Sequence, residues 1–498
     1  MLFRKYKPLI LFILASSLFL GCAKNPVSGM PDFVTITEQQ EISMGASYHS
    51  KILEENKVIK NIELNNYFKD LGETIAKNSH RPELNWKFTL IDNPQFNAFA
   101  TPGGYVYFYR GILPYFNSEE ELVGVIGHEI GHITARHAVR GMSTAQVTNI
   151  LIGIVASRVP GSGLTDNAFN LLNMAINRGY SRKYELEADQ LGKEYLLASG
   201  YNPYAMKAFL QVMKDRDDLE RKIAEYEGRE PMVGYHGIFS THPDTEKRLE
   251  KVITEKEYQI NKKSKNKEKF LKMIDGLVYG SSPEEGYVKN NVFYHSDLAI
   301  KFSFDDSWSL QNNPTNIILN KDDTKLVINL EELLKDDLEN GLTPKKFLDD
   351  GISKTSFLER NELLENQEFN FNELIGHTML YKSSSTFSEK YKRFTAIFDV
   401  KEKNLKPKVW IFVSQSPDIS GDSFAKQIVE TFSKMSDVEV KNSKGLRIKV
   451  IRFRTGMSYE SLAKQSPLGK FAEDKLRLLN GHYPNKNPKV GDLIKIVQ

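Results

Sequence analysis

The chain has 498 residues, more than one hydrophobic core usually supports, so we expect two or three domains. Lysine and arginine number 67 against 64 aspartates and glutamates, and the resulting net charge of +3 is too small to indicate nucleic-acid binding. No glycine-rich phosphate loop occurs in the sequence, and its single cysteine excludes an intramolecular disulfide.

The first residues have the features of a processing segment. Basic residues precede the apolar run Leu9–Leu20, which is short for a mature membrane helix. The run ends at Gly21, and the cysteine that follows resembles the lipidated residue of a bacterial lipoprotein signal. The residues before Gly21 are larger than that pattern prefers, which leaves ordinary cleavage or an uncut anchor open. We expect a signal peptide at 1–21, lipidation of Cys22 and a tether at 22–36.

Helices and strands are predicted to alternate before the central motif. Helical patterns begin near Thr37 and Ile62, and Trp86–Asp92 and Tyr105–Tyr109 are typical of strands. We interpret Tyr105–Tyr109 as an edge strand whose free N–H and C=O groups could hold an extended peptide. The alternative is that these residues only cover a core.

The most informative stretch is His128-Glu129-Ile130-Gly131-His132, which apolar spacing places within a helix. Two histidines at i and i+4 project from one helical face and can chelate one metal ion. Glu129 lies beside them, where it could take a proton from a metal-bound water. Two histidines do not complete a zinc site, so a third ligand is required.

The same helix carries signals at its start and along its length. Ser118 and Glu121 have the spacing of a capping box. Gly124, Gly127 and Gly131 weaken a helix, and we interpret them as positions where another backbone or a substrate comes close.

A second helical segment, from Tyr180, contains a candidate for the missing ligand. Glu185 and Asp189 stand one turn apart on the same side, so Glu185 could bind zinc while Asp189 accepts the spare ring N–H of a ligating histidine. Glu187 should point elsewhere. The alternative is an exposed acidic helix face.

Four sequence motifs together carry a family resemblance. His-Glu-x-x-His and the later Ser-Arg-x-x-Glu-x-x-Ala-Asp are accompanied by Asn97–Leu113 and by Phe239–Leu249, which contains His-Pro. Together they resemble the M48 metallopeptidases, a gluzincin-type family, and especially their secreted bacterial lipoprotein branch, over roughly residues 25–253. The resemblance implies a mainly helical zinc peptidase domain with a small sheet at 37–258.

The last of these motifs adds candidate site residues. His242 could occupy the fourth zinc position as a gate that substrate must open, could donate to the oxyanion, or could only stabilise a turn. Arg248 could help the oxyanion or pair with an acid. His137 and His236 receive no role.

Three further regions complete the chain. Residues 259–290 are predicted as a basic linker rather than a membrane-facing patch. Residues 291–440 alternate strands with helices, as in a small α+β accessory domain with a mostly antiparallel sheet. Residues 446–498 are predicted as strand, helix, helix and strand, similar to a LysM-like βααβ fold. That analogy implies peptidoglycan contact, and packing against the peptidase is equally compatible with it.

We therefore expect an α+β protein whose function is zinc-dependent endopeptidase activity, with His128, His132 and Glu185 holding one Zn²⁺ and Glu129 and Asp189 serving catalysis. The resemblance implies quality control of misfolded envelope proteins from a lipid anchor in the outer membrane, facing the periplasm. Expected partners are unfolded or misassembled envelope proteins, the membrane and, as a further candidate, peptidoglycan. The alternatives are a chaperone with a latent site and a peptidoglycan-associated adaptor.

Overall fold

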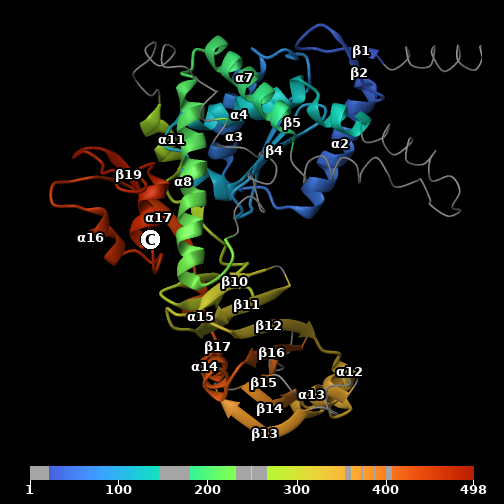
Figure 1. The fold of residues 1–498 in the computed structure, drawn as a ribbon, viewed down its shortest axis with the longest axis vertical. Coiled ribbons are helices and arrows are strands. Elements are labelled where there is room, and N and C mark those ends of the chain that lie inside the picture. Colours follow the sequence, from blue (N-terminus) through green and yellow to red (C-terminus); the bar gives the residue numbers. More distant parts are fainter. Residues whose placement is uncertain are drawn as a thin grey trace, which may run out of the picture.

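The computed structural model describes residues 22–144, 180–231, 248, 266–313, 315–353, 361–371, 374–385, 388–399 and 407–498. The chain is α+β, as expected, with helices and several separate sheets. Figure 1 shows a body of helices around α8 (Tyr204–Glu227) at the top, the larger sheets at the bottom and the C-terminal unit beside α8. We call residues 38–144, 180–231 and 266–274 the helical body. In the described part of the chain, no helix combines the length and apolar character needed to cross a membrane.

The segment predicted as a tether is folded against the helical body. Strand β1 (Cys22–Lys24) pairs antiparallel with β2 (Pro31–Phe33), and Val34 and Ile36 are buried in a core with Ile52 and Tyr107. Residues 22–36 were predicted as a tether, and the structure packs them on the helical body. The two apolar anchors of this segment stand among turn-forming residues, so no periodic pattern reveals them.

The predicted helices after Thr37 and Ile62 are confirmed as α2 (Glu38–Glu55) and α3 (Ile62–Ala76). Thr37 forms a capping box with Gln40 at the start of α2. The apolar side chains on one face of α3 are buried in the main core. This face holds α3 against the small sheet and the helix that follows it.

The small sheet has the order β3-β5-β4, with β3 (Lys87–Ile91) parallel to β5 (Tyr105–Tyr109) and β4 (Ala98–Thr101) antiparallel to it. Because β5 is the central strand, the prediction that Tyr105–Tyr109 lies at an edge is wrong. Alternation along a single strand does not reveal its neighbours. On the side near the central motif, the edge strand among those described is β4.

The central motif lies in α4 (Glu119–Thr134), whose residues are all buried except Glu121. Ser118 accepts a hydrogen bond from the Glu121 N–H at 3.2 Å, as a capping residue should. The Glu121 carboxylate, however, accepts from the Asn117 N–H at 2.8 Å rather than from that of Ser118. Only half of the predicted capping box is present.

Helix α7 (Arg182–Ala198) crosses α4 at glycine contacts. A Cβ atom on Gly131 would lie 2.9 Å from the Ala188 carbonyl oxygen, and one on Gly192 would lie 2.9 Å from the His128 backbone nitrogen. The predicted close approach is therefore confirmed, and the partner is the backbone of α7. This contact fixes the distance between the two helices that carry the candidate ligands.

Helix α11 (Lys267–Ile274) corrects the predicted linker at 259–290. Its residues Phe270, Leu271 and Ile274 belong to the main core of the helical body. From Lys267 onward, the linker prediction is wrong. Lys267, Lys269 and Lys272 are exposed on the outer face of this short helix and conceal its apolar face in the composition.

Residues 287–442, which we call the two-sheet domain, confirm the expected antiparallel α+β character. A seven-stranded sheet has the order β10-β11-β12-β16-β15-β14-β13, and a four-stranded sheet has the order β17-β9-β8-β7. The strands are β7 (Tyr287–Lys289), β8 (Val292–His295), β9 (Ile300–Ser303), β10 (Ser309–Asn312), β11 (Asn316–Lys321), β12 (Thr324–Glu332), β13 (Asn361–Phe371), β14 (Leu374–Ser385), β15 (Ser388–Asp399), β16 (Lys408–Ser416) and β17 (Ser433–Lys434).

One helix packs on each face of the larger sheet. Helix α14 (Ile419–Glu430) packs against β16 and β12, and α13 (Pro344–Ser353) packs against β15 and β14. Alternate residues of β16 belong to different cores, so the two helices lie on opposite faces. The short helices α12 (Lys335–Glu339) and α15 (Asp437–Asn442) complete the domain.

The C-terminal unit has the predicted order: β18 (Leu446–Arg452), α16 (Tyr459–Lys464), α17 (Ala472–Leu479) and β19 (Leu493–Val497). Strands β18 and β19 pair antiparallel, and β18 also pairs with β6 (Val278–Tyr279). The fully buried Lys495 donates hydrogen bonds to the carbonyl oxygens of Pro114 and Phe116, at 2.7 and 2.6 Å. These carbonyls lie at the end of the short helix η2 (Arg110–Tyr115), directly before α4. The unit is thus docked on the helical body, while its LysM-like identity stays a prediction.

Candidate metal centre and catalytic site

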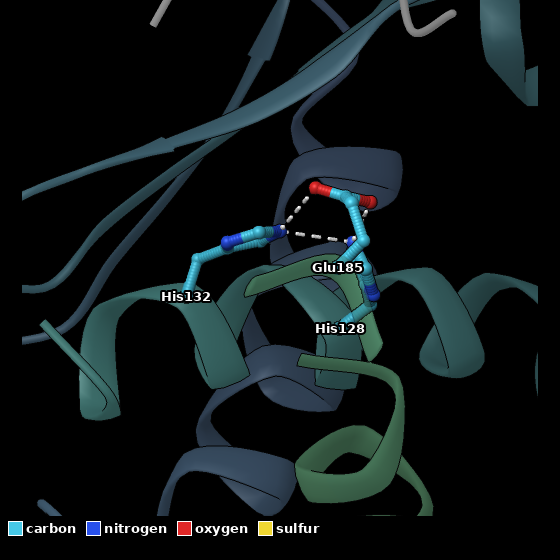
Figure 2. Close-up of side chains that lie close together, drawn as sticks. All are labelled: His128, His132 and Glu185. Carbon is cyan, nitrogen blue, oxygen red and sulfur yellow. Dashed lines mark hydrogen bonds and ion pairs between the residues drawn. The ribbon is translucent and has the colours of Figure 1, made fainter. Parts of the chain in front are cut away.

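Three buried side chains converge between α4 and α7 (Figure 2). The facing Nε2 atoms of His128 and His132 are 3.0 Å apart, and the Glu185 carboxylate lies 3.5 and 3.4 Å from them. One donor atom from each residue lies within 4.8 Å of the others, so the three could hold a metal ion. Two ligand atoms about 2.0–2.1 Å from a tetrahedral zinc ion are roughly 3.3 Å apart, which agrees with the spacing of these groups.

On the first histidine, a carboxylate fixes the ring. His128 Nδ1 lies 2.8 Å from Asp189 Oδ1, and Asp189 accepts two hydrogen bonds from Arg248, each of 2.7 Å. Burial raises the pKa of Asp189, but the Arg248 guanidinium outweighs it and leaves the pKa below its usual value. The carboxylate is therefore ionised and accepts the Nδ1–H of His128. This leaves the Nε2 lone pair directed at the cluster.

Arg248 lies where the acid-pairing interpretation places it. Besides Asp189, its guanidinium lies 2.9 Å from the Glu185 carboxylate. One cation therefore links the candidate metal ligand of α7 with the carboxylate that orients His128. Arg248 holds Asp189 by hydrogen bonds and Glu185 by an ion pair, and its role toward an oxyanion stays a prediction.

Glu129, next to His128 on the buried helix, is fully buried. Burial, and then the negative charges of Glu129 and Glu185, raise the pKa of Tyr180. The Tyr180 ring in turn stacks on His132, with centroids 4.1 Å apart. The Glu129 carboxylate therefore acts electrostatically on a ring that lies against the candidate metal ligand.

The second histidine has a different neighbour. His132 Nδ1 lies 2.8 Å from His137 Nδ1, and His137 Nε2 lies 3.2 Å from the Glu187 carboxylate. Sequence reasoning assigned neither residue a role. Helical spacing could not place His137, because the helix ends at Thr134 and Arg136 adopts a left-handed conformation with φ of 55°. Glu187 does point away from the metal cluster, and it points to His137.

A buried ion network fixes the end of α4. Glu41 of α2 pairs with Arg81 and Arg136, each at 2.7 Å, and Arg81 also donates to the Ile133 carbonyl at 3.3 Å. Because Glu41, Arg81 and Arg136 are buried, loss of Glu41 would leave two guanidinium groups inside the protein without the carboxylate that they share. The network therefore secures the turn that brings His137 back to His132.

Two predicted sites are not addressed by this geometry. His242 and His236 lie outside the described residues, so the gate stays a prediction. Cys22 forms the first residue of β1, and its lipidation is likewise still a prediction.

Comparisons with known proteins agree with this arrangement. Residues 63–256 match the model of peptidase family M48. The chain is 29% identical over 234 residues to the beta-barrel assembly-enhancing protease of Yersinia pestis, covering 45% of each chain. It is 29% identical over 225 residues to the protein of that name from Escherichia coli K12, covering 43% of each. It is also 29% identical over 206 residues to the mitochondrial metalloendopeptidase OMA1 of Schizosaccharomyces pombe, covering 41% of this chain and 53% of that protein.

The chain spans about half the length of these curated relatives. The two-sheet domain and the C-terminal unit lie outside the segment that matches the family model. The helices α4 and α7, with all three candidate ligands, Glu129 and Asp189, lie inside it. The part of the chain that carries the candidate site, residues 63–256, therefore matches peptidase family M48.

Proposed function

We propose that this chain is a zinc-dependent endopeptidase. The observation that carries the proposal is the convergence of His128, His132 and Glu185 in a buried cluster, with Glu129 adjacent on the same helix. Two imidazole nitrogens and one carboxylate are a typical donor set for catalytic zinc, which leaves a fourth position open. When bound, zinc would acidify an attacking water and polarise the scissile carbonyl.

The protein groups then have separate tasks. The Glu129 carboxylate accepts the proton of the attacking water and returns it to the nitrogen of the leaving amine. Asp189 accepts a hydrogen bond from the Nδ1–H of His128, which keeps the proton on that nitrogen, and Arg248 keeps Asp189 ionised. The cluster is buried, so these charges act at close range in a poorly screened environment.

The substrate would bind along β4. This strand pairs only with β5 among the described strands, and it packs on α4. All four residues of β4 are buried, so an extended peptide could form backbone hydrogen bonds with its outer edge only after that edge is uncovered. Binding of this kind selects conformation more than sequence. Such binding suits unfolded or misassembled proteins.

The biological setting is proposed from the relatives. The names beta-barrel assembly-enhancing protease and mitochondrial metalloendopeptidase both denote proteolysis, and the first connects it with beta-barrel assembly in a bacterium. We propose quality control of misfolded outer-membrane or periplasmic proteins, by a protein anchored through lipid at Cys22 in the outer membrane and facing the periplasm. As an additional partner, we propose peptidoglycan, which the C-terminal unit would contact.

Glu129→Gln tests the proposal. We expect wild type and variant each to bind about one zinc ion per chain. Because the amide cannot accept the proton, the variant should cleave an unfolded test protein about 10²–10⁴-fold more slowly. The exposed Glu194→Gln on α7 serves as control and should cleave like wild type. A latent-site chaperone or a peptidoglycan adaptor predicts instead that Glu129→Gln retains full function in cells.

A further inference from the structure

The inference concerns the proton positions around His132 and rests on the proposed zinc site. His132 can contact a metal held with His128 and Glu185 only through Nε2, which lies 3.0 and 3.4 Å from those partners. A neutral ring with a free Nε2 carries its proton on Nδ1. His132 Nδ1 is therefore a hydrogen-bond donor.

The atom that faces this donor is another ring nitrogen. His137 Nδ1 lies 2.8 Å from His132 Nδ1, a distance at which the two nitrogens share one proton. Because His132 supplies that proton, His137 Nδ1 is the acceptor. The proton of the neutral His137 ring must then lie on its other nitrogen, Nε2.

The next contact agrees with this assignment. His137 Nε2 lies 3.2 Å from a Glu187 oxygen, which can only accept when the carboxylate is ionised. Arg140 lies 3.2 Å from the same oxygen and 3.2 Å from Asp32. In this series of hydrogen bonds, His132 therefore donates to His137 and His137 donates to Glu187. The donors point away from the metal ligand, toward the ion pair of Glu187 with Arg140.

Aromatic rings hold both imidazoles in this arrangement. Tyr180 stacks on His132 at 4.1 Å with an angle of 19°, and Tyr184 stacks on His137 at 4.4 Å with an angle of 12°. His137 is fully buried. The two planes are thus fixed from their faces as well as by their nitrogens.

We propose that His137 and Glu187 are positioning residues that set the tautomer and orientation of His132 for zinc. They are the counterpart of Asp189 and Arg248 on His128. The two ligands differ in one respect: His128 donates directly to a carboxylate, whereas His132 donates to a neutral imidazole that separates it from its carboxylate. A group that only packs between Tyr184 and His132 would need neither nitrogen of His137.

Matched variants separate positioning from packing. His137→Leu retains bulk and removes the acceptor, while His137→Gln restores an amide oxygen as acceptor. Glu187→Gln changes only the distal, partly exposed carboxylate, so it tests the chain without disturbing the core. The exposed Glu194→Gln, two turns along α7, is its control.

The measurements are zinc affinity, by competition with a chelator, and the visible spectrum of the Co²⁺-substituted protein. We expect about a 10–100-fold loss of zinc affinity and an altered Co²⁺ spectrum in His137→Leu, with partial recovery of both in His137→Gln. Glu187→Gln should show a smaller loss of zinc affinity, and Glu194→Gln none. Wild-type affinity and spectrum in both His137→Leu and Glu187→Gln would overturn the proposal, as would equal losses in Glu187→Gln and Glu194→Gln.

These readouts are independent of peptide cleavage. If wild type binds zinc but does not cleave protein, the proposed function fails while the positioning result stands. If wild type cleaves protein and the variants bind zinc normally, only the positioning proposal fails.

Discussion

Replacing Gly192 with alanine adds one methyl group where α7 touches α4. The new Cβ would lie 2.9 Å from the His128 backbone nitrogen and 3.1 Å from the Gly127 carbonyl carbon. Ordinary contacts need roughly 3.5 Å, so the helices must separate by about 0.5 Å. Glu185 lies two turns from Gly192 on the same helix, so this movement acts directly on the spacing between ligands.

The stability effect should be small, because two contributions oppose each other. Overpacking costs about 1–3 kcal/mol, and replacing a helical glycine by alanine returns about 1 kcal/mol. The metal site is less tolerant, since ligand distances must hold to about 0.2 Å. We expect Gly192→Ala to lower the free energy of unfolding by about 0–2 kcal/mol and to weaken zinc binding at least about tenfold.

Urea unfolding of the metal-free protein and chelator competition would measure the two quantities. Gly141→Ala is a matched control, because Gly141 lies in the helical stretch 137–144 and an added Cβ would meet no atom of another described element within 4 Å. Its free energy of unfolding should increase by up to about 1 kcal/mol, and it should bind zinc like wild type. If Gly192→Ala also bound zinc with wild-type affinity, the helix crossing would not control the ligand geometry.

Two further predictions concern the C-terminal unit. The Lys495→Met variant loses the hydrogen-bond donor to two buried carbonyl groups and the opposing charge near Glu121. We therefore expect its free energy of unfolding to be about 3–5 kcal/mol lower than that of wild type. A decrease below about 1 kcal/mol in urea unfolding would contradict this expectation. Burial, and then the charge of Lys267, lower the pKa of His482 to about 4, which an NMR titration can check. Between pH 6.5 and 4 the unfolded chain binds more protons at His482, so stability should decrease as the pH falls through this range. The His482→Gln variant should show a shallower decrease.

The helices that carry the candidate ligands could be predicted because each motif is local. His128 and His132 share one helix face, as do Glu185 and Asp189, and a spacing of four residues is enough to place each pair. The glycines of α4 indicated that another backbone or a substrate would approach. Nothing in their spacing identified α7 as that backbone, because the crossing depends on tertiary packing.

The features that were missed depend on long-range contacts or on irregular backbone. The position of β5 inside its sheet follows from a parallel pairing with β3 that single-strand alternation does not encode. His137 reaches His132 through a left-handed residue at Arg136, where helical periodicity no longer applies. The burial of α11 was concealed because composition averages over the two faces of a short helix.

The buried position of the Lys495 side chain also determines how the C-terminal unit can be studied. Its side-chain nitrogen donates to the carbonyl groups at the end of η2, immediately before the helix that carries the histidines. Deleting residues 446–498 would open that junction to solvent, and lost proteolysis in such a truncation would not distinguish an absent glycan contact from a loosened catalytic helix. Surface substitutions that leave β19 in place are the informative way to ask what this unit binds.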